Sequence, residues 1–294
     1  ALMTLGLRLP FKRVLPWSVL DCRMRRFSVR PMSTPYKRVP PWRVAGCRTR
    51  LLAVMPRQWS YAEASAMPTV WVTVWMCLEE LVPVMLDRGV LVQAATGGVG
   101  LVAARCAQRA GARVCATAGR AEKQGFVRGL GVSLLSTTRD GVAFAGELKE
   151  IVGGGCGLGV VLNSLSHDEY IPAAACQLGE GGRFVEIGKR GIWRRGRMAA
   201  ELEHVRYSIV AMDGQCGLDP GWQHGGLQGL GGLDEPATPL LPVHRYELCS
   251  EGVEGFRMLQ RAGQIGKVVL RLQDHDTTRR CLENTERVSV TGGT

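Results

Sequence analysis

The part of the sequence that most restricts the possible folds of this chain is the run Val90-Leu-Val-Gln-Ala-Ala-Thr-Gly-Gly-Val-Gly100. A short apolar segment leads into a turn of small residues, and residues 101–111 have the pattern of a helix. Ala95, Gly97 and Gly100 occupy the small-residue positions of a G-x-G-x-x-G pattern. Small residues there allow a tight turn, close approach of the backbone to a pyrophosphate and close packing of helix on strand. The predicted dinucleotide-binding residues of this turn are Ala95, Thr96, Gly97, Gly98, Val99 and Gly100.

The residues that follow this helix distinguish between the two nicotinamide dinucleotides. Residues 112–117 read as a second strand, after which an NAD site carries an acidic residue for the ribose 2′-hydroxyl. This chain has no acid between Asp87 and Glu122, and it places Arg120 and Lys123 just past the strand. Since a 2′-phosphate requires cationic donors, the sequence favours NADPH, with these two cations as its ligands. The alternative is an ordinary exposed basic loop.

Positive charge is concentrated at the N-terminus. Residues 1–58 hold 13 Lys and Arg against the single acid Asp21, together with seven prolines, whereas the remaining chain has 24 basic and 25 acidic residues. Such a segment is typical of an organelle transit peptide or of a tail that binds nucleic acid. The interpretation we rank first is a poorly ordered segment or a remnant of a substrate domain, in a cytoplasmic protein with no nucleic-acid partner.

From residue 58 onward, strands and helices alternate, which predicts an α/β fold with a doubly wound parallel sheet. Ser60 with Glu63 and Ser166 with Glu169 each have the spacing of a capping box before an apolar run. Residues 214–232 contain eight glycines, too many for a stable helix on propensity alone. We therefore expect a Gly-rich loop over residues 214–238.

The ten cysteines are scattered, without a C-x-x-C motif or Cys/His clustering. This distribution indicates a reducing compartment and no metal site. No apolar run reaches membrane-spanning length, so no membrane association is expected.

A family resemblance rests on several further motifs. They are Trp59-Ser-Tyr-Ala-Glu-Ala, Pro68 through Thr73-Val-Trp75, Val161-Leu-Asn-Ser-Leu165, Gly182-Arg-Phe-Val-Glu-Ile-Gly-Lys189, Leu241-Pro-Val-His244 and the closing Gly266-Lys-Val-Val-Leu270. Together with the glycine turn, they resemble the enoyl reductase domain of type I polyketide synthases and of animal-type fatty acid synthase. These domains are zinc-free, quinone-oxidoreductase-like members of the medium-chain dehydrogenase/reductase superfamily. The resemblance covers roughly 200 of the 294 residues, in the family's order.

The resemblance implies a reaction in polyketide or fatty acid synthesis. NADPH would deliver a hydride to the β-carbon of an α,β-unsaturated thioester held on an acyl carrier protein or on CoA, and a proton would then reach the α-carbon. By resemblance, Thr73, Asn163, Ser164 and Gly188 would lie near the nicotinamide and its ribose. Arg139 would help to hold the 2′-phosphate. Other synthase domains and a second copy of the chain are the expected protein partners.

Lys189 and Asp213 are the candidate catalytic pair for proton transfer. Each follows an apolar run, so both are expected at the carboxyl edge of the sheet, where open α/β sheets bind ligands. An ammonium group there can stabilise enolate charge or donate the proton, with the carboxylate holding it in place. The alternative is an ordinary ion pair at two strand ends.

Residues 1–50 do not match the family's N-terminal substrate barrel, so we expect an incomplete GroES-like β-barrel beside an intact Rossmann domain. Two other functions stay open: a stand-alone quinone or enone oxidoreductase, and a non-catalytic NADPH-binding module. The expected organisation is a basic segment at 1–58, the NADPH-binding Rossmann domain with its leading helices at 59–213, the Gly-rich loop at 214–238, a C-terminal return to the substrate domain at 239–272 and a tail at 273–294.

Overall fold

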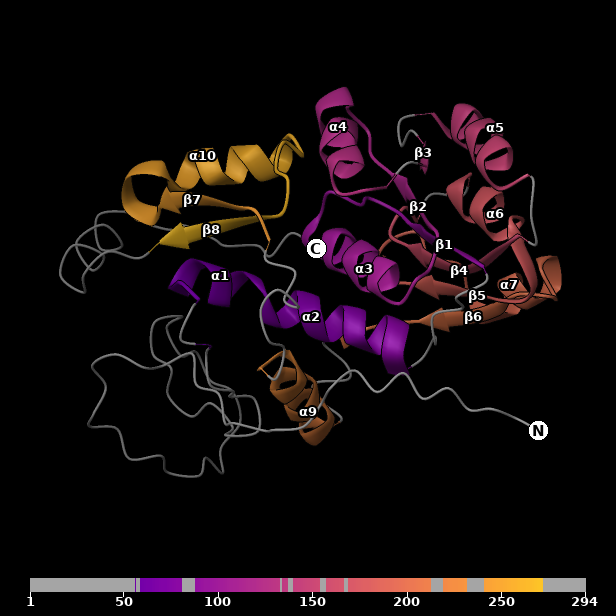
Figure 1. The fold of residues 1–294 in the computed structure, drawn as a ribbon, viewed down its shortest axis with the longest axis horizontal. Coiled ribbons are helices and arrows are strands. Elements are labelled where there is room, and N and C mark those ends of the chain that lie inside the picture. Colours follow the sequence, from indigo (N-terminus) through magenta and orange to yellow (C-terminus); the bar gives the residue numbers. More distant parts are fainter. Residues whose placement is uncertain are drawn as a thin grey trace.

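A six-stranded parallel sheet with the strand order β3-β2-β1-β4-β5-β6 is the larger of the two sheets and lies among α3 to α7 (Figure 1). The computed structural model describes residues 56, 59–80, 88–132, 134–136, 140–153, 157–166, 169–212, 219–231 and 241–271. The strands of this sheet are β1 (Gly89–Val92), β2 (Val114–Thr117), β3 (Leu134–Ser136), β4 (Leu158–Asn163), β5 (Leu178–Glu186) and β6 (Arg206–Ile209). Every neighbouring pair is parallel, which confirms the predicted doubly wound sheet. The chain builds outward from β1 to β3 and then resumes at β4, so the strand order reverses between β1 and β4.

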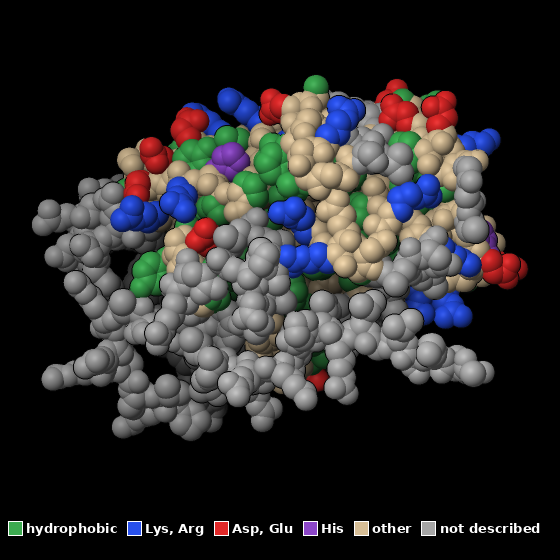
Figure 2. All heavy atoms as spheres, in the orientation of Figure 1, with side chains coloured by type: hydrophobic (Ala, Val, Ile, Leu, Met, Phe, Trp, Pro, Cys, Tyr) green, Lys and Arg blue, Asp and Glu red, His purple; other side chains and the backbone are tan. Residues whose placement is uncertain are grey.

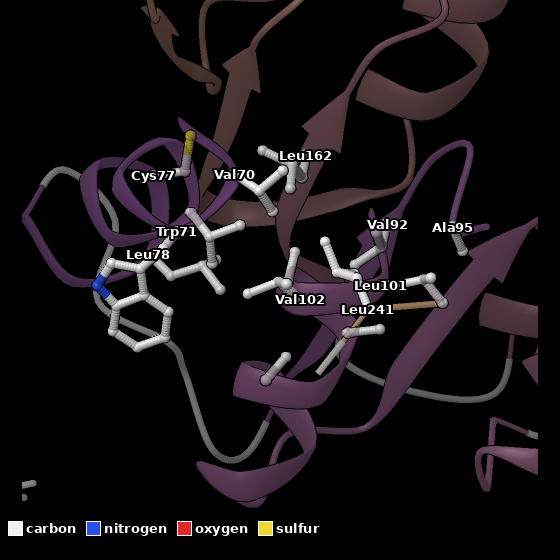
Figure 3. Close-up of a cluster of buried hydrophobic side chains, with 14 of the residues drawn as sticks. Val70, Trp71, Cys77, Leu78, Val92, Ala95, Leu101, Val102, Leu162 and Leu241 are labelled. Carbon is white, nitrogen blue, oxygen red and sulfur yellow. The ribbon is translucent and has the colours of Figure 1, made fainter. Parts of the chain in front are cut away.

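Helices cover both faces of the sheet, and the alternation of side chains along each strand explains why. In β1, Val90 and Val92 join one buried cluster while Leu91 joins the other, and in β4 Leu162 and Val161 divide in the same way. The first cluster packs under α2 and α3, as Figure 3 shows for several of its members. The second packs under α5, α6 and α7. Strands buried on both faces are what a parallel sheet requires.

The helices begin and end close to where the sequence places them, with some exceptions. They are α1 (Tyr61–Ala66), α2 (Pro68–Trp75) continued by η2 (Met76–Glu80), α3 (Gly98–Arg109), α4 (Ala121–Gly129), α5 (Gly141–Val152), α6 (Tyr170–Ala175), α7 (Arg195–Glu201), α9 (Pro220–Gly231) and α10 (Leu248–Gln260). The capping box of Ser60 and Glu63 is confirmed at the start of α1. The second predicted capping box is wrong, because the Ser166 hydroxyl donates instead to Glu186 and no side chain caps α6.

Helix α9 corrects the expectation of a Gly-rich loop for residues 220–231. Residues 214–218 and 232–238 of that predicted loop lie outside the described residues. Asp219 accepts hydrogen bonds from the first backbone N–H groups of this helix, those of Gly221 and Trp222. The indole of Trp71 donates to the Gly226 carbonyl at 3.0 Å, and Trp75 stacks on Trp222 with ring centroids 4.9 Å apart. Capping and packing against α2 therefore outweigh the low helix propensity of the glycines.

The C-terminal residues form a separate small unit, made of β7 (Val243–Glu247), α10 and β8 (Lys267–Arg271), which we call the C-terminal unit. Its two strands pair in parallel, and the unit lies beside α1, away from the outer strands of the large sheet (Figure 1). The predicted substrate-barrel remnant falls almost entirely outside the described residues. Within the described ranges, no helix is long and apolar enough to cross a membrane.

Candidate active site

The glycine turn after β1 has the backbone geometry of a phosphate cradle. Ala94 adopts a left-handed φ of 48°, and its N–H donates to the Thr117 hydroxyl at the end of β2. A Cβ on Gly100 would lie 2.6 Å from the Ala94 carbonyl oxygen, so only glycine fits this position. Gly97 is the N-cap of α3 and supplies no side-chain oxygen to the first N–H groups of that helix. The turn thus leaves the positive N-terminal end of α3 facing a site that an anion can occupy.

The C-terminal unit reaches this turn and brings a lysine to it. The N–H of Gly266 donates to the Thr96 carbonyl at 2.8 Å, and Gly97 and Gly266 form a parallel β-bridge. A Cβ on Gly98 would lie 2.9 Å from Cε of Lys267, so this lysine side chain lies against the first turn of α3. Burial lowers the pKa of Lys267 below its usual range. Sequence reasoning missed this residue, since 169 positions separate it from Gly98.

Arg120 and Lys123, the predicted 2′-phosphate ligands, lie at the start of α4 and contact the C-terminal unit. The Arg120 guanidinium donates to the Arg261 carbonyl at 2.8 Å, and the Lys123 ammonium donates to the Ala262 carbonyl at 2.7 Å. Both carbonyls belong to the C-terminal end of α10, where cations are electrostatically favoured. The two cations are therefore neighbours near the dinucleotide turn, and Lys123 is largely buried. Their role as phosphate ligands stays a prediction.

A buried polar network lies at the carboxyl edge of β4 and β5. Glu186, the last residue of β5, is fully buried, and its Oε2 accepts a hydrogen bond from Nδ2 of Asn163 at 2.6 Å. Its Oε1 accepts from the Ser166 hydroxyl at 3.0 Å and from the Gly188 N–H at 2.6 Å. Burial raises the pKa of Glu186, and the hydrogen bonds from these donors oppose that shift. Two predicted nicotinamide residues, Asn163 and Gly188, are thus held by one carboxyl group that sequence reasoning missed.

Gln93 extends the network to the end of β1, at the point where the strand order reverses. Its Oε1 accepts hydrogen bonds at 3.0 Å from the backbone N–H groups of Ser164 and Leu165. Three buried polar atoms here have no partner among the described residues: Nε2 of Gln93, Oδ1 of Asn163 and Oγ of Ser164. Buried polar groups are normally paired, so these atoms indicate that a polar ligand belongs at this edge. A dinucleotide, with its amide and its ribose hydroxyls, fits this donor and acceptor set.

The other predicted site residues are not part of this polar network, or lie outside the described part of the chain. Thr73 is largely buried on α2, and its hydroxyl donates to the Thr69 carbonyl at 2.7 Å. Lys189 is exposed, three residues after the buried strand end. Arg139 and Asp213 lie outside the described residues, so the pairing of Lys189 with Asp213 stays a prediction. In the part of the chain that the structure describes, no three His, Cys, Asp or Glu side chains are grouped to hold a metal ion.

Comparisons with known proteins agree with this arrangement. Residues 98–201 match the family described as zinc-binding dehydrogenase. One component of the phenolphthiocerol/phthiocerol polyketide synthase of Mycobacterium tuberculosis is 32% identical over 216 residues, which are 72% of this chain and 10% of that protein. The chain thus spans about a tenth of the length of the first curated relatives it matches.

Two solved structures place these matches within one type of domain. The CurK enoyl reductase superposes with a TM-score of 0.70 at 33% identity, over 76% of this chain and 66% of that one. The nucleotide-binding subdomain of the enoylreductase domain of PpsC from Mycobacterium tuberculosis gives 0.50 at 34% identity, over 55% of this chain and 90% of that one. This chain belongs to the enoyl reductase domains of type I polyketide synthases, within the medium-chain dehydrogenase/reductase superfamily.

Proposed function

We propose that this chain is an NADPH-dependent enoyl-thioester reductase that acts on carbon–carbon double bonds in polyketide or fatty acid synthesis. The observation that carries the proposal is the meeting, at one reversal of strand order, of the glycine turn after β1 and the Asn163–Glu186 network after β4 and β5. When bound, the cofactor supplies the hydride for the β-carbon of the substrate. The substrate is an enoyl thioester on a carrier protein or on CoA, in a cytoplasmic assembly with other synthase domains.

Different residues of the chain bind the phosphate groups and the nicotinamide riboside of the cofactor. The N–H groups of Gly98, Val99 and Gly100 and the Lys267 ammonium bind the pyrophosphate, because these groups surround the positive end of α3. Arg120 and Lys123 bind the 2′-phosphate, and Arg139 is a third predicted ligand of it. Gln93, Asn163 and Ser164 orient the nicotinamide riboside through their unpaired buried atoms. By resemblance, Thr73 and Gly188 also lie near the nicotinamide and its ribose.

Proton transfer to the α-carbon falls to Lys189, which is exposed beyond the end of β5. Its ammonium can donate a proton or stabilise negative charge on the thioester oxygen, with Asp213 orienting it. Because the predicted substrate barrel is incomplete, we expect slow turnover with small thioesters. A second subunit packed as a homodimer is a further element of the proposal.

The test is a fluorescence titration of the whole chain with NADPH and NADH, followed by absorbance assays of cofactor oxidation. We expect NADPH to bind at least about tenfold more tightly than NADH, a difference of about 1.4 kcal/mol. A crotonyl thioester of pantetheine should be reduced faster than a quinone, and the Lys189→Ala variant should lose turnover but keep NADPH binding. Equal affinity for both cofactors contradicts the roles of Arg120 and Lys123. Preference for the quinone, or binding without any turnover, favours one of the alternative functions.

A further inference from the structure

Glu186 is a fully buried carboxyl group whose two oxygens are both engaged by donors. One of these donors cannot change its role: the Gly188 N–H, 2.6 Å away, can only donate. Oε1 must therefore act as an acceptor. The fit around it is tight, since a Cβ on Gly188 would collide with the Ser166 hydroxyl and lie 2.7 Å from Oε1. The carboxyl group is thus fixed in one orientation.

This fixed orientation determines which way the Asn163 side-chain amide is turned. The second oxygen, Oε2, accepts a hydrogen bond from Nδ2 of Asn163 at 2.6 Å. The amide must therefore direct its NH₂ toward Glu186 and its carbonyl oxygen Oδ1 away from it. Oδ1 is buried and has no hydrogen-bond partner among the described residues. An unpaired buried acceptor is costly, so its orientation has to be imposed by a stronger interaction.

We propose that Glu186 is a positioning residue of the nicotinamide site, which locks the Asn163 amide so that Oδ1 is available to accept a hydrogen bond from a donor of the bound dinucleotide, a ribose hydroxyl or the carboxamide NH₂. This inference rests on the proposed function and deepens it. Glu186 does not touch the cofactor itself. It acts through Asn163, at the carboxyl edge of the sheet, where the strand order reverses between β1 and β4.

The first variant is Glu186→Gln, which keeps the size of the side chain but replaces Oε2 by an NH₂ group. The glutamine oxygen still accepts from Gly188, so its NH₂ faces the Asn163 NH₂ at a distance where two donors repel. Asn163 then turns over and presents a donor in place of Oδ1. We expect the Kd for NADPH to rise about tenfold, measured by fluorescence titration. The matched control is Glu180→Gln, the same change at an exposed position of β5, and its affinity should equal that of the wild type.

The decisive variant exchanges the two partners, Asn163→Asp with Glu186→Gln. Donor and acceptor are swapped, so the hydrogen bond reforms and a carboxylate oxygen of the new residue at position 163 again faces the ligand as an acceptor. We expect NADPH affinity within about threefold of the wild type, whereas Asn163→Asp alone brings two carboxyl groups together and should bind poorly. A role of Glu186 that does not act through residue 163 would not produce this rescue. Circular dichroism and thermal unfolding of each variant report whether it is folded.

The outcomes separate this inference from the proposed function. If the wild type does not bind NADPH, the proposed function is overturned, and this inference with it. If the wild type binds and Glu186→Gln binds equally well, only the positioning role is overturned. The positioning role is also overturned if the exchanged variant is folded but binds NADPH no better than Glu186→Gln. It is overturned as well if both Glu186→Gln and the exchanged variant fail to fold. Rescue by the exchanged variant supports the inference.

Discussion

At the scale of one residue, the burial of the Lys267 ammonium lowers the stability of the fold and places a positive charge at the glycine turn. Its side chain lies against Gly98 at the start of α3, and burial lowers its pKa. In the folded protein the neutral form is therefore relatively favoured, and keeping the ammonium at neutral pH costs stability. A bound phosphate would offset this cost, since an opposite charge favours the ammonium form.

Replacing Lys267 by Met should separate stability from binding. The pKa of Lys267 is lower in the folded state than in the unfolded state, where it is about 10.4. The stability linked to this difference is fully present at pH values above the unfolded pKa, and it is lost as the pH falls through the folded pKa. We therefore expect Lys267→Met to unfold at a higher temperature than the wild type at neutral pH, with a gap that narrows toward about pH 10. NADPH should bind about tenfold or more weakly, because a hydrogen bond to a charged group contributes about 1.5–3 kcal/mol. Lys149→Met, at an exposed position of α5, is the control; weaker stability and unchanged affinity in Lys267→Met would contradict this account.

At the scale of one element, α9 shows that packing can make a helix from a sequence with a poor propensity for it. The helix contains adjacent glycines with opposite surroundings. Gly225 is exposed, and a Cβ there would meet nothing within 4 Å. Gly226 is buried against α2, and a Cβ there would approach Cζ3 of Trp75 to 2.6 Å and the neighbouring Cε3 more closely still. Only one of the two glycines is required by the tertiary structure.

The alanine substitutions at these two positions form a matched pair with opposite expected signs. Gly225→Ala should raise the free energy of unfolding by up to about 1 kcal/mol, the difference in helix propensity between the two residues. Gly226→Ala should lower it by about 1–3 kcal/mol, because the added methyl group overpacks the contact with Trp75. Urea denaturation of both variants provides the measurement. Equal effects would mean that α9 does not pack on α2 as described.

At the scale of the whole molecule, the C-terminal unit is joined to the Rossmann sheet at the cofactor turn. The bridge between Gly97 and Gly266 is one contact between them, and the hydrogen bonds of Arg120 and Lys123 to the end of α10 are another. Figure 1 shows α10 beside α4, and Figure 2 shows that Lys and Arg side chains are interspersed with Asp and Glu on the described part of this face. The closing segment of the chain therefore contributes to the stability of the region that binds the cofactor.

Lys123→Met tests whether this junction also determines cofactor choice. We expect the free energy of unfolding to fall by about 2 kcal/mol, because a hydrogen bond from a charged group is lost and the Ala262 carbonyl loses its partner. If Lys123 also binds the 2′-phosphate, the preference for NADPH over NADH should fall as well. Arg128→Met, an exposed position of α4, should change stability by less than about 0.5 kcal/mol. A variant with lower stability and an unchanged preference would restrict Lys123 to a structural role.

Local patterns in the sequence were sufficient for the parallel sheet, the glycine turn and the capping box of Ser60 and Glu63. Each depends on residues that are close in the chain: apolar periodicity, small side chains in a turn and a hydroxyl three residues from a carboxylate. The same local reasoning failed where remote groups compete for the same atoms. Ser166 has the spacing of a helix cap, but its hydroxyl is taken by Glu186, 20 residues away.

By itself, then, the sequence determined the α/β class, the site of the dinucleotide turn and the family motifs, because these follow from short-range sterics and hydrophobic periodicity. Only the tertiary structure decided which residues complete the site. The partners of Lys123, Asn163 and Gly98 are 139, 23 and 169 positions away, respectively. No short-range preference links such residues. They meet because parallel strands align their carboxyl ends at one edge and because the segment that leads into β8 lies at the glycine turn.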